Sequence, residues 1–406
     1  DCGAGGLSSA IGEMASENGA EVDIALAPLK YPGLASGEIW LSEAQERMVL
    51  AVPPQKLVAL KEICCTYDIE LTDLGCITNT KQVVVRYGSQ IVLNLNGVLP
   101  PIGSDHIVHG GKVKLLHLRE KFGDSWKKFN LAYFVSSGLP FAPKIWIKIY
   151  KLFGIKIVWN QNGVAYTGLY SKEVSDNINS LMRPIHQSDY VIYQTEFVKK
   201  CADMFLGTFK GPSEIIDNPV DTDHFIPGPS PLALEPLVIL TTINHSSLER
   251  ITITLRAVKK LHDQGIKTKL IILGDFKKAG WLDAEKNVDD EITRNNLLGW
   301  VDKYGSYMQQ DAPKLFQKAH IFVHLKYLDP CPTLVLEALA CGLPVVGSMS
   351  GGMPEMVPEK SGILIPIKED FNNLHYPSIE EVTNAILSIH KNLPDWSKSA
   401  RDGVIL

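Results

Sequence analysis

Short apolar runs of strand length alternate with amphipathic helical patterns from Lys112 to the end of the 406-residue chain. The alternation is clearest in the last part, where the apolar runs at 237–243 and 321–325 are each followed by a helical pattern and a further apolar run lies at 269–273. Strands that alternate with helices form parallel sheets covered on both faces. Because one domain takes roughly 150 residues, this region predicts an α/β structure with two Rossmann-like halves.

The most informative stretch runs from Asp329 to Val346. It predicts an acidic loop after a strand, a helix that opens at Pro332 and Thr333, and a further strand. Proline suits the first helical position, and the free N–H groups of a helix start attract phosphate. Asp329 precedes the helix and Glu337 lies within it, and carboxylates accept hydrogen bonds from sugar hydroxyls. The stretch predicts a nucleotide-sugar site, although a helix cap and a solvated helix residue explain the two carboxylates when each is taken alone.

Several glycines follow other predicted strands of the same region. Gly274 ends the strand at 269–273, and Gly351 and Gly352 form a turn before a further helix. Open α/β sheets bind ligands at the carboxyl ends of their strands. We therefore expect these glycines to lie at the same edge as Asp329 and Glu337.

Residues 1–99 follow a different, α+β pattern. Helices are predicted at 10–18 and 54–67, and strands at 21–26, 47–52, 69–76, 81–87 and 90–95. The last two strands form a predicted hairpin about Gly88-Ser89. The glycine-rich opening either cradles phosphate or forms a tight turn. Residues 100–111, with Pro100-Pro101 and little periodicity, predict a linker, and 227–236 a proline-rich joint.

The composition excludes some classes of protein. Hydrophobic residues are 45% and charged residues 21%, as in globular proteins, and the net charge of -5 argues against a nucleic-acid-binding surface. The seven cysteines form no CxxC pair and no zinc-like spacing, which indicates free thiols in a reducing cytoplasm and no metal site. His106 and His109 lack a third ligand. The opening on Asp1, without methionine and inside a glycine-rich motif, indicates a fragment or a trimmed chain.

No apolar run reaches the roughly 18 residues of a membrane helix. The run at 141–158 comes closest, but it carries Lys144, Lys148, Lys151 and Lys156. We therefore predict no membrane span, and peripheral association with a membrane stays open.

The motifs DCGAGGLSSAIGEM, PLKYPGL and EIWLSEAQERMVLAVPP resemble phosphoribosylformylglycinamidine synthase, the glutamine- and ATP-dependent enzyme of purine biosynthesis. The resemblance covers residues 1–99 and only a late segment of that enzyme. The family's ATP-binding half and catalytic histidine region have no counterpart here. It implies a partial α+β domain in which Asp1, Gly3, Gly5 and Gly6 match a ligand-proximal glycine loop.

A second resemblance covers residues 112–406. IILGDF, NNLLGWVD, AHIFVHL, DPCPTLVLEALACGLPVVGS and SGGMPEMV resemble the C-terminal domain of family 4 glycosyltransferases, and DNPVDTDHF resembles their interdomain segment. That family has the GT-B architecture of two Rossmann-like domains. The resemblance implies an acceptor half at 112–226 and a donor-binding domain at 237–406. The acceptor half lacks the family's first glycine loop, and whether it is complete or incomplete stays open.

The resemblance also implies roles for single residues. Glu337 would accept from the ribose hydroxyls and Asp329 would contact the transferred sugar. Arg250 falls at the position of a lysine that faces the diphosphate, with an exposed helix charge as the alternative. Asn162, followed by Gly163, stands where many members have a histidine. An amide cannot act as a base, and a turn that closes the strand explains it equally well. The backbone N–H groups at the helix start would meet the diphosphate; they belong to Cys331, Thr333 and Leu334.

The implied function is a cytoplasmic, retaining glycosyltransferase that moves a sugar from a nucleotide-sugar donor to a glycan, lipid-linked or small-molecule acceptor. The family needs no metal and no cofactor, and nucleic acid is not an expected partner. Two alternatives stay open. One is an inactive fusion or a join of two fragments, and the other is a fragment of an ATP-dependent amidine ligase that acts through residues 1–99.

Overall fold

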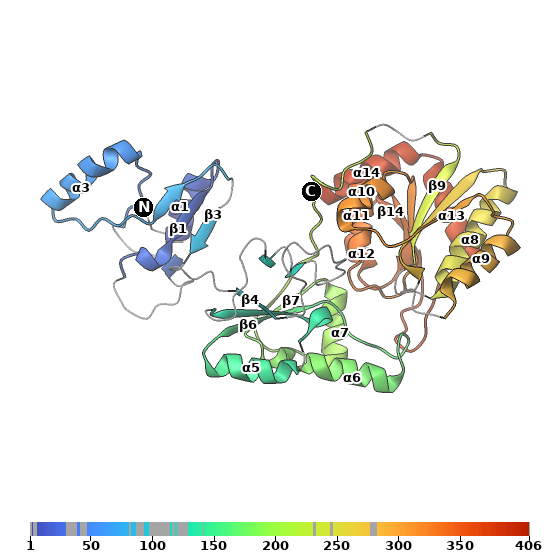
Figure 1. Cartoon of the computed structure of the whole chain (residues 1–406), viewed down its shortest axis with the longest axis horizontal. Helices are drawn as coiled ribbons and strands as arrows, with labels where there is room; N and C mark the ends of the chain where they lie inside the picture. Colours follow the sequence, from blue (N-terminus) through green and yellow to red (C-terminus); the bar gives the residue numbers. More distant parts are fainter. Residues whose placement is uncertain are drawn as a thin grey trace. The chain divides into compact units, whose positions relative to one another are not determined.

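The computed structural model describes residue 2 and residues 6–29, 39–40, 47–80, 83–86, 93–96, 114–115, 118–119, 129–140, 142–229, 233–243, 247–276 and 282–405. The chain forms two compact units, the first from 1–94 with 121–130 and the second from 95–120 with 131–406 (Figure 1). The linker predicted at 100–111 lies outside the described residues.

The first unit is built on a small sheet with the strand order β2-β1-β3. The central strand β1 pairs antiparallel with β2 and parallel with β3. Helix α1 buries Leu7 and Ile11 with Val22 of β1 in one apolar cluster, so this unit has its own core. Its elements are α1 (Gly6–Ala15), β1 (Ala20–Asp23), η1 (Ile24–Leu26), η2 (Pro54–Lys56), α3 (Leu57–Thr66), β2 (Gly75–Ile77) and β3 (Val83–Arg86).

Three strand predictions in this region are wrong. The predicted hairpin does not form, because β3 pairs in parallel with β1 while β4 (Leu93–Asn96) is the edge strand of a different sheet. Residues 47–52 have no regular structure, and in place of the strand predicted at 69–76 the structure has a shorter one, β2, at Gly75–Ile77. Apolar alternation stabilises a strand only where a neighbour can pair with it and bury one face.

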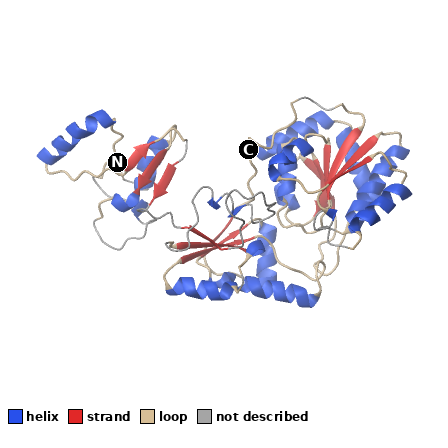
Figure 2. Cartoon of the chain, in the orientation of Figure 1, coloured by secondary structure: helices blue, strands red, loops and turns tan. Residues whose placement is uncertain are grey.

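The second unit contains a five-stranded sheet with the order β4-β5-β6-β7-β8, in which the strands from β5 to β8 are parallel (Figure 2). Its core is aromatic, and the rings of Phe134 and Trp159 stack with centroids 5.9 Å apart. The strand expected at 113–118 is wrong, because the described residues Lys114 and Leu115 are helical. The elements are β5 (Leu131–Val135), η3 (Ser136–Gly138), α5 (Pro143–Leu152), β6 (Lys156–Gln161), α6 (Lys172–Met182), η4 (Arg183–Gln187), β7 (Tyr190–Tyr193), α7 (Glu196–Leu206) and β8 (Ser213–Ile215).

The same unit contains a six-stranded parallel sheet with the order β11-β10-β9-β12-β13-β14. Successive residues of a strand enter opposite cores, as Ile239 and Leu240 of β9 do. The order reverses between β9 and β12, which is where such sheets open a crevice for ligands. The strands are β9 (Leu237–Thr242), β10 (Thr268–Leu273), β11 (Val301–Tyr304), β12 (Ile321–His324), β13 (Val345–Met349) and β14 (Gly362–Pro366).

Helices cover both faces of this sheet. One core gathers α8, α9 and α13, and the other gathers α10, α11 and α12. The predicted pair of parallel α/β domains is therefore confirmed. No helix in the described part of the chain is long and apolar enough to cross a membrane. The helices are α8 (Leu248–Asp263), α9 (Ala284–Arg294), η6 (Gln309–Asp311), α10 (Ala312–Phe316), α11 (Thr333–Ala340), α12 (Met353–Met356), α13 (Ile379–His390) and α14 (Leu393–Ile405).

Candidate functional site

Asp329 lies just beyond the carboxyl end of β12, beside the strand-order reversal. Its Oδ2 lies 3.2 Å from Lys326 Nζ and 3.0 Å from His324 Nε2. Burial alone would raise the pKa of Asp329. The attraction of Lys326 and the hydrogen bond from His324 outweigh burial and hold that pKa well below its usual range. Asp329 is therefore a buried carboxylate that stays ionised, with both contacts on the same oxygen.

Glu337 projects from the second turn of α11 and is only 5% exposed. Its Oε1 accepts a hydrogen bond of 3.1 Å from Gln309 Nε2. Burial raises the pKa of Glu337 from 4.5 to about 7, against the opposing effect of that hydrogen bond. Burial and then the charge of Glu337 raise the pKa of Tyr307, so this phenol lies close to the carboxylate. The alternative of a solvated helix residue is wrong for Glu337.

Helix α11 begins without a side-chain cap. It begins at Thr333, and Pro332 occupies the N-cap position rather than the first helical one. Asn218 Nδ2 donates to the carbonyl of Cys331 at 3.1 Å and to Thr333 Oγ1 at 3.3 Å, which ties down the loop. The N–H groups of a first helical turn have no intrahelical acceptor. Those near Thr333 and Leu334 can therefore meet an anion at the positive end of the helix dipole.

The predicted glycine turn, Gly351-Gly352, lies in close contact with the backbone of the acidic loop that contains Asp329. Gly351 has a φ of 66°, and a Cβ there would come within 2.3 Å of the carbonyl oxygen of Asp329. A Cβ on Gly352 would lie 2.1 Å from the carbonyl oxygen of Pro330, and the Gly352 N–H donates to Asp329 O at 2.9 Å. Only glycine permits this approach. Gly274 ends β10 with a φ of 116° and donates its N–H to Tyr304 O at 3.1 Å.

Arg250 lies in α8 and is only 3% exposed, so the alternative of an exposed helix charge is wrong. Its guanidinium donates to the carbonyl of Thr242 at the end of β9. Burial lowers the pKa of Arg250 to about 10, and the charge of Asp329 acts in the opposite direction. A buried cation therefore lies close to Asp329. His245, which also follows β9 in the sequence, lies outside the described residues.

Sequence reasoning missed two further cations at this edge. Lys326 is three residues before Asp329, and its spacing was the one available signal. Lys114 comes from a segment more than 200 positions away and gave no signal. Burial lowers the pKa of Lys114 to about 8, opposed by the nearby Cys331 and Asp217. An ammonium group thus lies next to the loop that leads into α11.

Asn162 and Gly163 follow β6 and face the same region. The Asn162 N–H donates to Ser136 Oγ and its Nδ2 donates to Ser137 Oγ, both at 2.8 Å. Its buried Oδ1 has no hydrogen-bond partner within the described residues. A Cβ on Gly163 would lie 3.2 Å from Pro330 Cγ, so this glycine lets the β6 loop approach the acidic loop.

Two cavities lie at the carboxyl ends of strands. One of about 310 Å³ is lined by the three residues of η3, by Leu139 and by Ile178, Leu181 and Met182 of α6. The other, of about 430 Å³, lies at the end of β11 and is lined by residues 304–308 and by Asp311, Lys314, Leu315 and Lys318. The first is mainly apolar and lies beside Asn162. The second is lined by two tyrosines, of which Tyr307 lies close to Glu337.

Hydrogen bonds join the two sheets of the second unit around the site. Thr195 Oγ1 donates to Pro330 O at 3.0 Å. The Glu355 carboxylate accepts from the backbone N–H groups of Glu196 at 2.6 Å and Phe197 at 2.9 Å. Glu355 therefore adds a negatively charged cap from the other sheet to a helix whose N-cap residue is Thr195, at the helix end where a negative charge is favourable.

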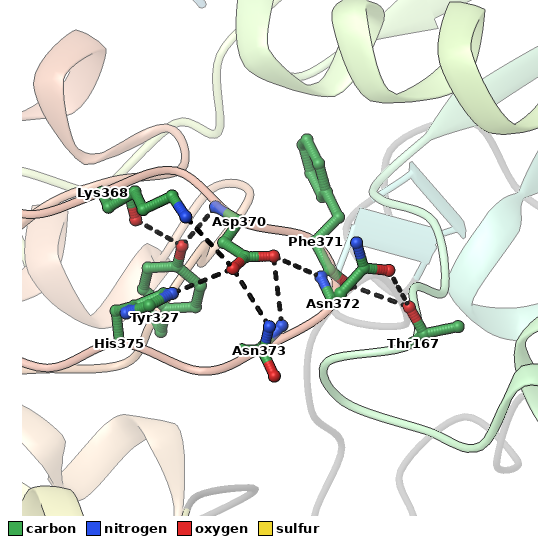
Figure 3. Close-up of polar contacts among 8 residues, drawn as sticks. All are labelled: Thr167, Tyr327, Lys368, Asp370, Phe371, Asn372, Asn373 and His375. Carbon is green, nitrogen blue, oxygen red and sulfur yellow. Dashed lines mark hydrogen bonds and ion pairs between the residues drawn. The ribbon is translucent and has the colours of Figure 1, made fainter.

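A second junction is formed by the loop after β14 (Figure 3). The Asp370 N–H donates to Tyr327 Oη at 2.6 Å, and its carboxylate accepts from His375 Nε2 at 3.1 Å. Thr167 Oγ1, on the other side of the junction, donates to Asn372 Oδ1 at 2.7 Å. Between them the ring of Phe371 packs against three aromatic rings of the five-stranded half, with centroids 5.6, 6.3 and 5.3 Å away; these belong to Tyr166, Phe197 and Phe205.

The glycine loop predicted in the first unit is described in part. Asp1, Gly3 and Gly5 lie outside the described residues. Gly6 is the buried first residue of α1 and has a φ of 61°. Among the described residues, no group of three or more His, Cys, Asp or Glu could hold a metal ion. All seven cysteines are free thiols.

Comparisons with known proteins find two family models that match separate parts of the chain. Residues 226–375 match the family model for glycosyl transferases group 1. Residues 1–88 match the family model for AIR synthase related protein, C-terminal domain. The chain is 35% identical over 107 residues to phosphoribosylformylglycinamidine synthase subunit PurL of Methanothermobacter thermautotrophicus, and 38% identical over 94 residues to that of Methanopyrus kandleri. These matches cover 25% and 23% of this chain but only 15% and 13% of the relatives' length.

Solved structures share the fold of the second unit. The Anabaena protein HepE, in complex with UDP-glucose, superposes with a TM-score of 0.58 at 16% identity, covering 77% of this chain and 93% of HepE. A sucrose-phosphate synthase from Thermosynechococcus elongatus gives a TM-score of 0.57 at 16% identity, covering 78% and 84%. The chain therefore joins a segment similar to the C-terminal domain of AIR-synthase-related proteins to a pair of α/β domains with the GT-B glycosyltransferase fold, the second of which carries the glycosyl transferases group 1 match.

Proposed function

We propose that the chain is a retaining glycosyltransferase that moves a sugar from a nucleotide-sugar donor to an acceptor. The observation that carries the proposal is the position of two carboxylates around α11, a helix that begins without a side-chain cap. Asp329 precedes the start of this helix and Glu337 lies in its second turn, at the strand-order reversal of a parallel sheet. The match to the glycosyl transferases group 1 model over these residues supports it. HepE, which has this fold, was solved with UDP-glucose.

Each part of the donor has a counterpart along this edge. The base would stack on Tyr304 or Tyr307 in the cavity of about 430 Å³. Glu337 would accept hydrogen bonds from the ribose hydroxyls, and the N–H groups at the start of α11 would meet the diphosphate. Asp329 would offer its Oδ1 to the hydroxyls of the transferred sugar, because Oδ2 is held by Lys326 and His324.

Catalysis would consist of positioning and of stabilising the departing diphosphate. Negative charge builds up on the diphosphate as the sugar leaves, and cations that are shielded from water stabilise it most. Lys326 and Arg250, which lie close to Asp329, and Lys114, which lies close to Cys331, would supply that charge. The pKa of Lys114, which burial lowers to about 8, still leaves its ammonium mostly charged at neutral pH.

The acceptor would bind on the side of the five-stranded sheet, in the cavity of about 310 Å³ beside Asn162. The unpartnered Asn162 Oδ1 can accept a hydrogen bond from an acceptor hydroxyl, while an amide cannot remove its proton. Glycans, lipid-linked sugars and small molecules are the candidate acceptor classes. We place the reaction in the cytoplasm, with peripheral membrane association as part of the proposal and with no cofactor.

The test is thermal stabilisation of the full chain by UDP-, GDP- and ADP-sugars. A ligand at about 100 times its Kd adds roughly 2.7 kcal/mol to the free energy of unfolding. We expect one nucleotide series to stabilise the wild type and the control Glu359→Ala, which changes an exposed glutamate, but not Glu337→Ala. Equal stabilisation of Glu337→Ala would exclude the assigned donor site. Failure of every donor to stabilise the wild type would favour an inactive join of two fragments.

Residues 1–88 carry no separate activity in this proposal. The match to PurL of Methanothermobacter thermautotrophicus spans 107 residues and only 15% of that relative's length. Because three of the four residues of the glycine loop lie outside the described part, the amidine-ligase alternative gains no support from an observed site.

A further inference from the structure

Helix α5 presents two adjacent stripes of opposite character on its outer side. Its sequence is PKIWIKIYKL, with no acidic residue. Lys144, Lys148 and Lys151 follow one another at intervals of four and three residues and form one stripe. An apolar stripe runs parallel to it at the same intervals, formed by Ile145, Ile149 and Leu152. Residues at these intervals lie on the same face of a helix.

The third face of α5 holds the helix on its sheet. Pro143, Ile147 and Tyr150 are buried, and the Tyr150 ring lies 6.3 Å from the ring of Phe134 in β5. Figure 1 shows α5 on the outer side of its sheet. Because the helix is anchored by one face, the residues of both stripes remain exposed. The stripes are therefore not an incompletely packed core.

The apolar stripe is large and open to solvent. The exposed fraction is 59% for Ile145, 82% for Leu152 and 72% for Phe153, which continues the stripe beyond the helix end. Trp146 beside it is 38% exposed. Soluble surfaces carry exposed apolar side chains singly, whereas a continuous apolar patch rimmed by charge marks an interaction site.

The lysine stripe identifies the partner by its charge. Lys144, Lys148 and Lys151 are all exposed, and they have no acidic partner among the residues that the structure describes. A helix with an apolar face, lysines beside it and an aromatic residue at the boundary is the form that binds in the headgroup region of a membrane. The chain as a whole carries a net charge of -5, so a negatively charged surface would be attracted locally to this helix and not to the protein in general.

We propose that α5 docks the protein on an anionic lipid surface, with Ile145, Ile149 and Leu152 inserted among the acyl chains and the three lysines at the lipid phosphates. Helix α5 would then be the surface through which the protein makes the peripheral membrane association of the proposed function. Docking would hold the cavity of about 310 Å³ close to a membrane-borne acceptor, because η3, which lines this cavity, precedes α5 in the chain. The acceptor consequence rests on the proposed glycosyltransferase activity, but docking itself does not.

The experiment is co-sedimentation of the full chain with vesicles of phosphatidylcholine alone and of phosphatidylcholine with 30% phosphatidylglycerol. We expect binding to the anionic vesicles only. Each lysine near such a surface contributes about fivefold to the partition coefficient, so Lys144→Glu/Lys148→Glu/Lys151→Glu should lower it at least about a hundredfold. Leu152→Ser/Phe153→Ser should lower it at least about tenfold.

Matched controls are available elsewhere on the surface. Lys286→Glu/Lys391→Glu/Lys398→Glu makes the same change of net charge at exposed lysines. Leu282→Ser/Leu298→Ser alters leucines that are 85% and 71% exposed, close to the values for Leu152 and Phe153. Both controls should bind anionic vesicles as the wild type does.

Three outcomes would overturn the proposal. The first is no binding of the wild type to anionic vesicles, and the second is equal loss in the controls. The third is a concentration-dependent dimer of the wild type, seen by sedimentation velocity, that the α5 variants abolish without any vesicle binding. That outcome would assign the face to a second copy of the chain. Nucleotide-sugar stabilisation measured on the same variants separates a failure of docking from a failure of the proposed activity, because α5 contributes no residue to the donor site.

Discussion

The side chain of Gln309 donates a hydrogen bond of 3.1 Å to Glu337, joining the segment after β11 to the helix after β12. This bond is the one polar contact between side chains that the described residues provide for a carboxylate that is 5% exposed. A neutral amide stabilises a buried carboxylate less than a cation would. Glu337 therefore keeps unused capacity to accept hydrogen bonds from a ligand, at a cost to the stability of the fold.

The first prediction concerns Glu337→Gln. Burial raises the pKa of Glu337 from 4.5 to about 7, so the folded state binds the proton more tightly than the unfolded state. The stability from this group is complete below about pH 4.5 and is lost as the pH rises through about 7, a total of up to about 3 kcal/mol. Glutamine has no charge to bury. We expect the variant to be more stable than the wild type at pH 8, with a smaller difference at pH 5.5.

Urea unfolding at both pH values measures this effect, and Glu359→Gln, at an exposed position, is the control that should not change the pH dependence. The same variant should lose stabilisation by the nucleotide sugar, because the amide replaces one of the two accepting oxygens of the carboxylate by an NH2 donor. A variant with the wild-type pH dependence would show that Glu337 is not the titrating group.

The second prediction concerns Lys326→Met. Lys326 provides the largest of the attractions that keep the buried Asp329 ionised. Removing it leaves the carboxylate with the hydrogen bond from His324 and the charge of Arg250, so the pKa of Asp329 rises. Leaving a buried charge short of a partner costs about 1–3 kcal/mol. Thermal or urea unfolding measures the loss. Lys314→Met breaks a comparable lysine–aspartate pair with Asp311, where the side chains are 79% and 50% exposed, and should cost about 0–1 kcal/mol. Equal effects of the two variants would contradict the role given to Lys326.

The third prediction concerns the cap that Glu355 places on α7. Its carboxylate accepts from the first two N–H groups of that helix, those of Glu196 and Phe197. Loss of an N-terminal cap costs about 1 kcal/mol. Glu355→Ala should therefore speed hydrogen exchange at these two amides and lower the free energy of unfolding by about that amount. Glu355→Gln should restore part of the protection, since its amide oxygen can still accept. Unchanged exchange in Glu355→Ala would mean that the cap does not persist in solution.

Much of the structure around the proposed donor site could be predicted because its signals are local. The loop of Asp329 and the helix of Glu337 follow from a run of apolar strand residues, a turn and a helical pattern in one continuous stretch. Parallel strands then bring the Gly351-Gly352 turn to the same edge without further information. Strands β5 and β7 were predicted at their observed bounds, 131–135 and 190–193, for the same reason.

The errors arose where distant segments decide the structure. Val83–Arg86 was assigned to a hairpin because Gly88-Ser89 is a local turn signal, yet it pairs with β1, more than 60 positions earlier. Arg250 sits in a helix that could expose it, but its guanidinium turns inward to the carbonyl of Thr242. Gln309 and Lys114 approach Glu337 and Cys331 only through the tertiary fold, so no pattern in the sequence connects them.

The last prediction concerns Gly351→Ala, which tests whether the glycine turn positions Asp329. A Cβ at this position would lie 2.3 Å from Asp329 O and 2.7 Å from Asp329 N, and both atoms are backbone, so the acidic loop must shift. Gly265→Ala is a matched control, because Gly265 also has a positive φ, 81°, but nothing lies within 4 Å of its Cβ. It should show only the cost of the left-handed backbone, roughly 1 kcal/mol. We expect Gly351→Ala to lose clearly more stability than this.

The displacement should also weaken stabilisation by the nucleotide sugar, whereas the control should keep it in full once its lower starting stability is taken into account. A shift of about 1 Å in a positioning group is enough to reduce catalysis about a hundredfold. If Gly351→Ala and Gly265→Ala lost the same stability and bound the donor equally well, the contact between Gly351 and Asp329 would have no part in forming the site. The acidic loop would then have to be held by its other contacts, those of Pro330 with Thr195 and of Cys331 with Asn218.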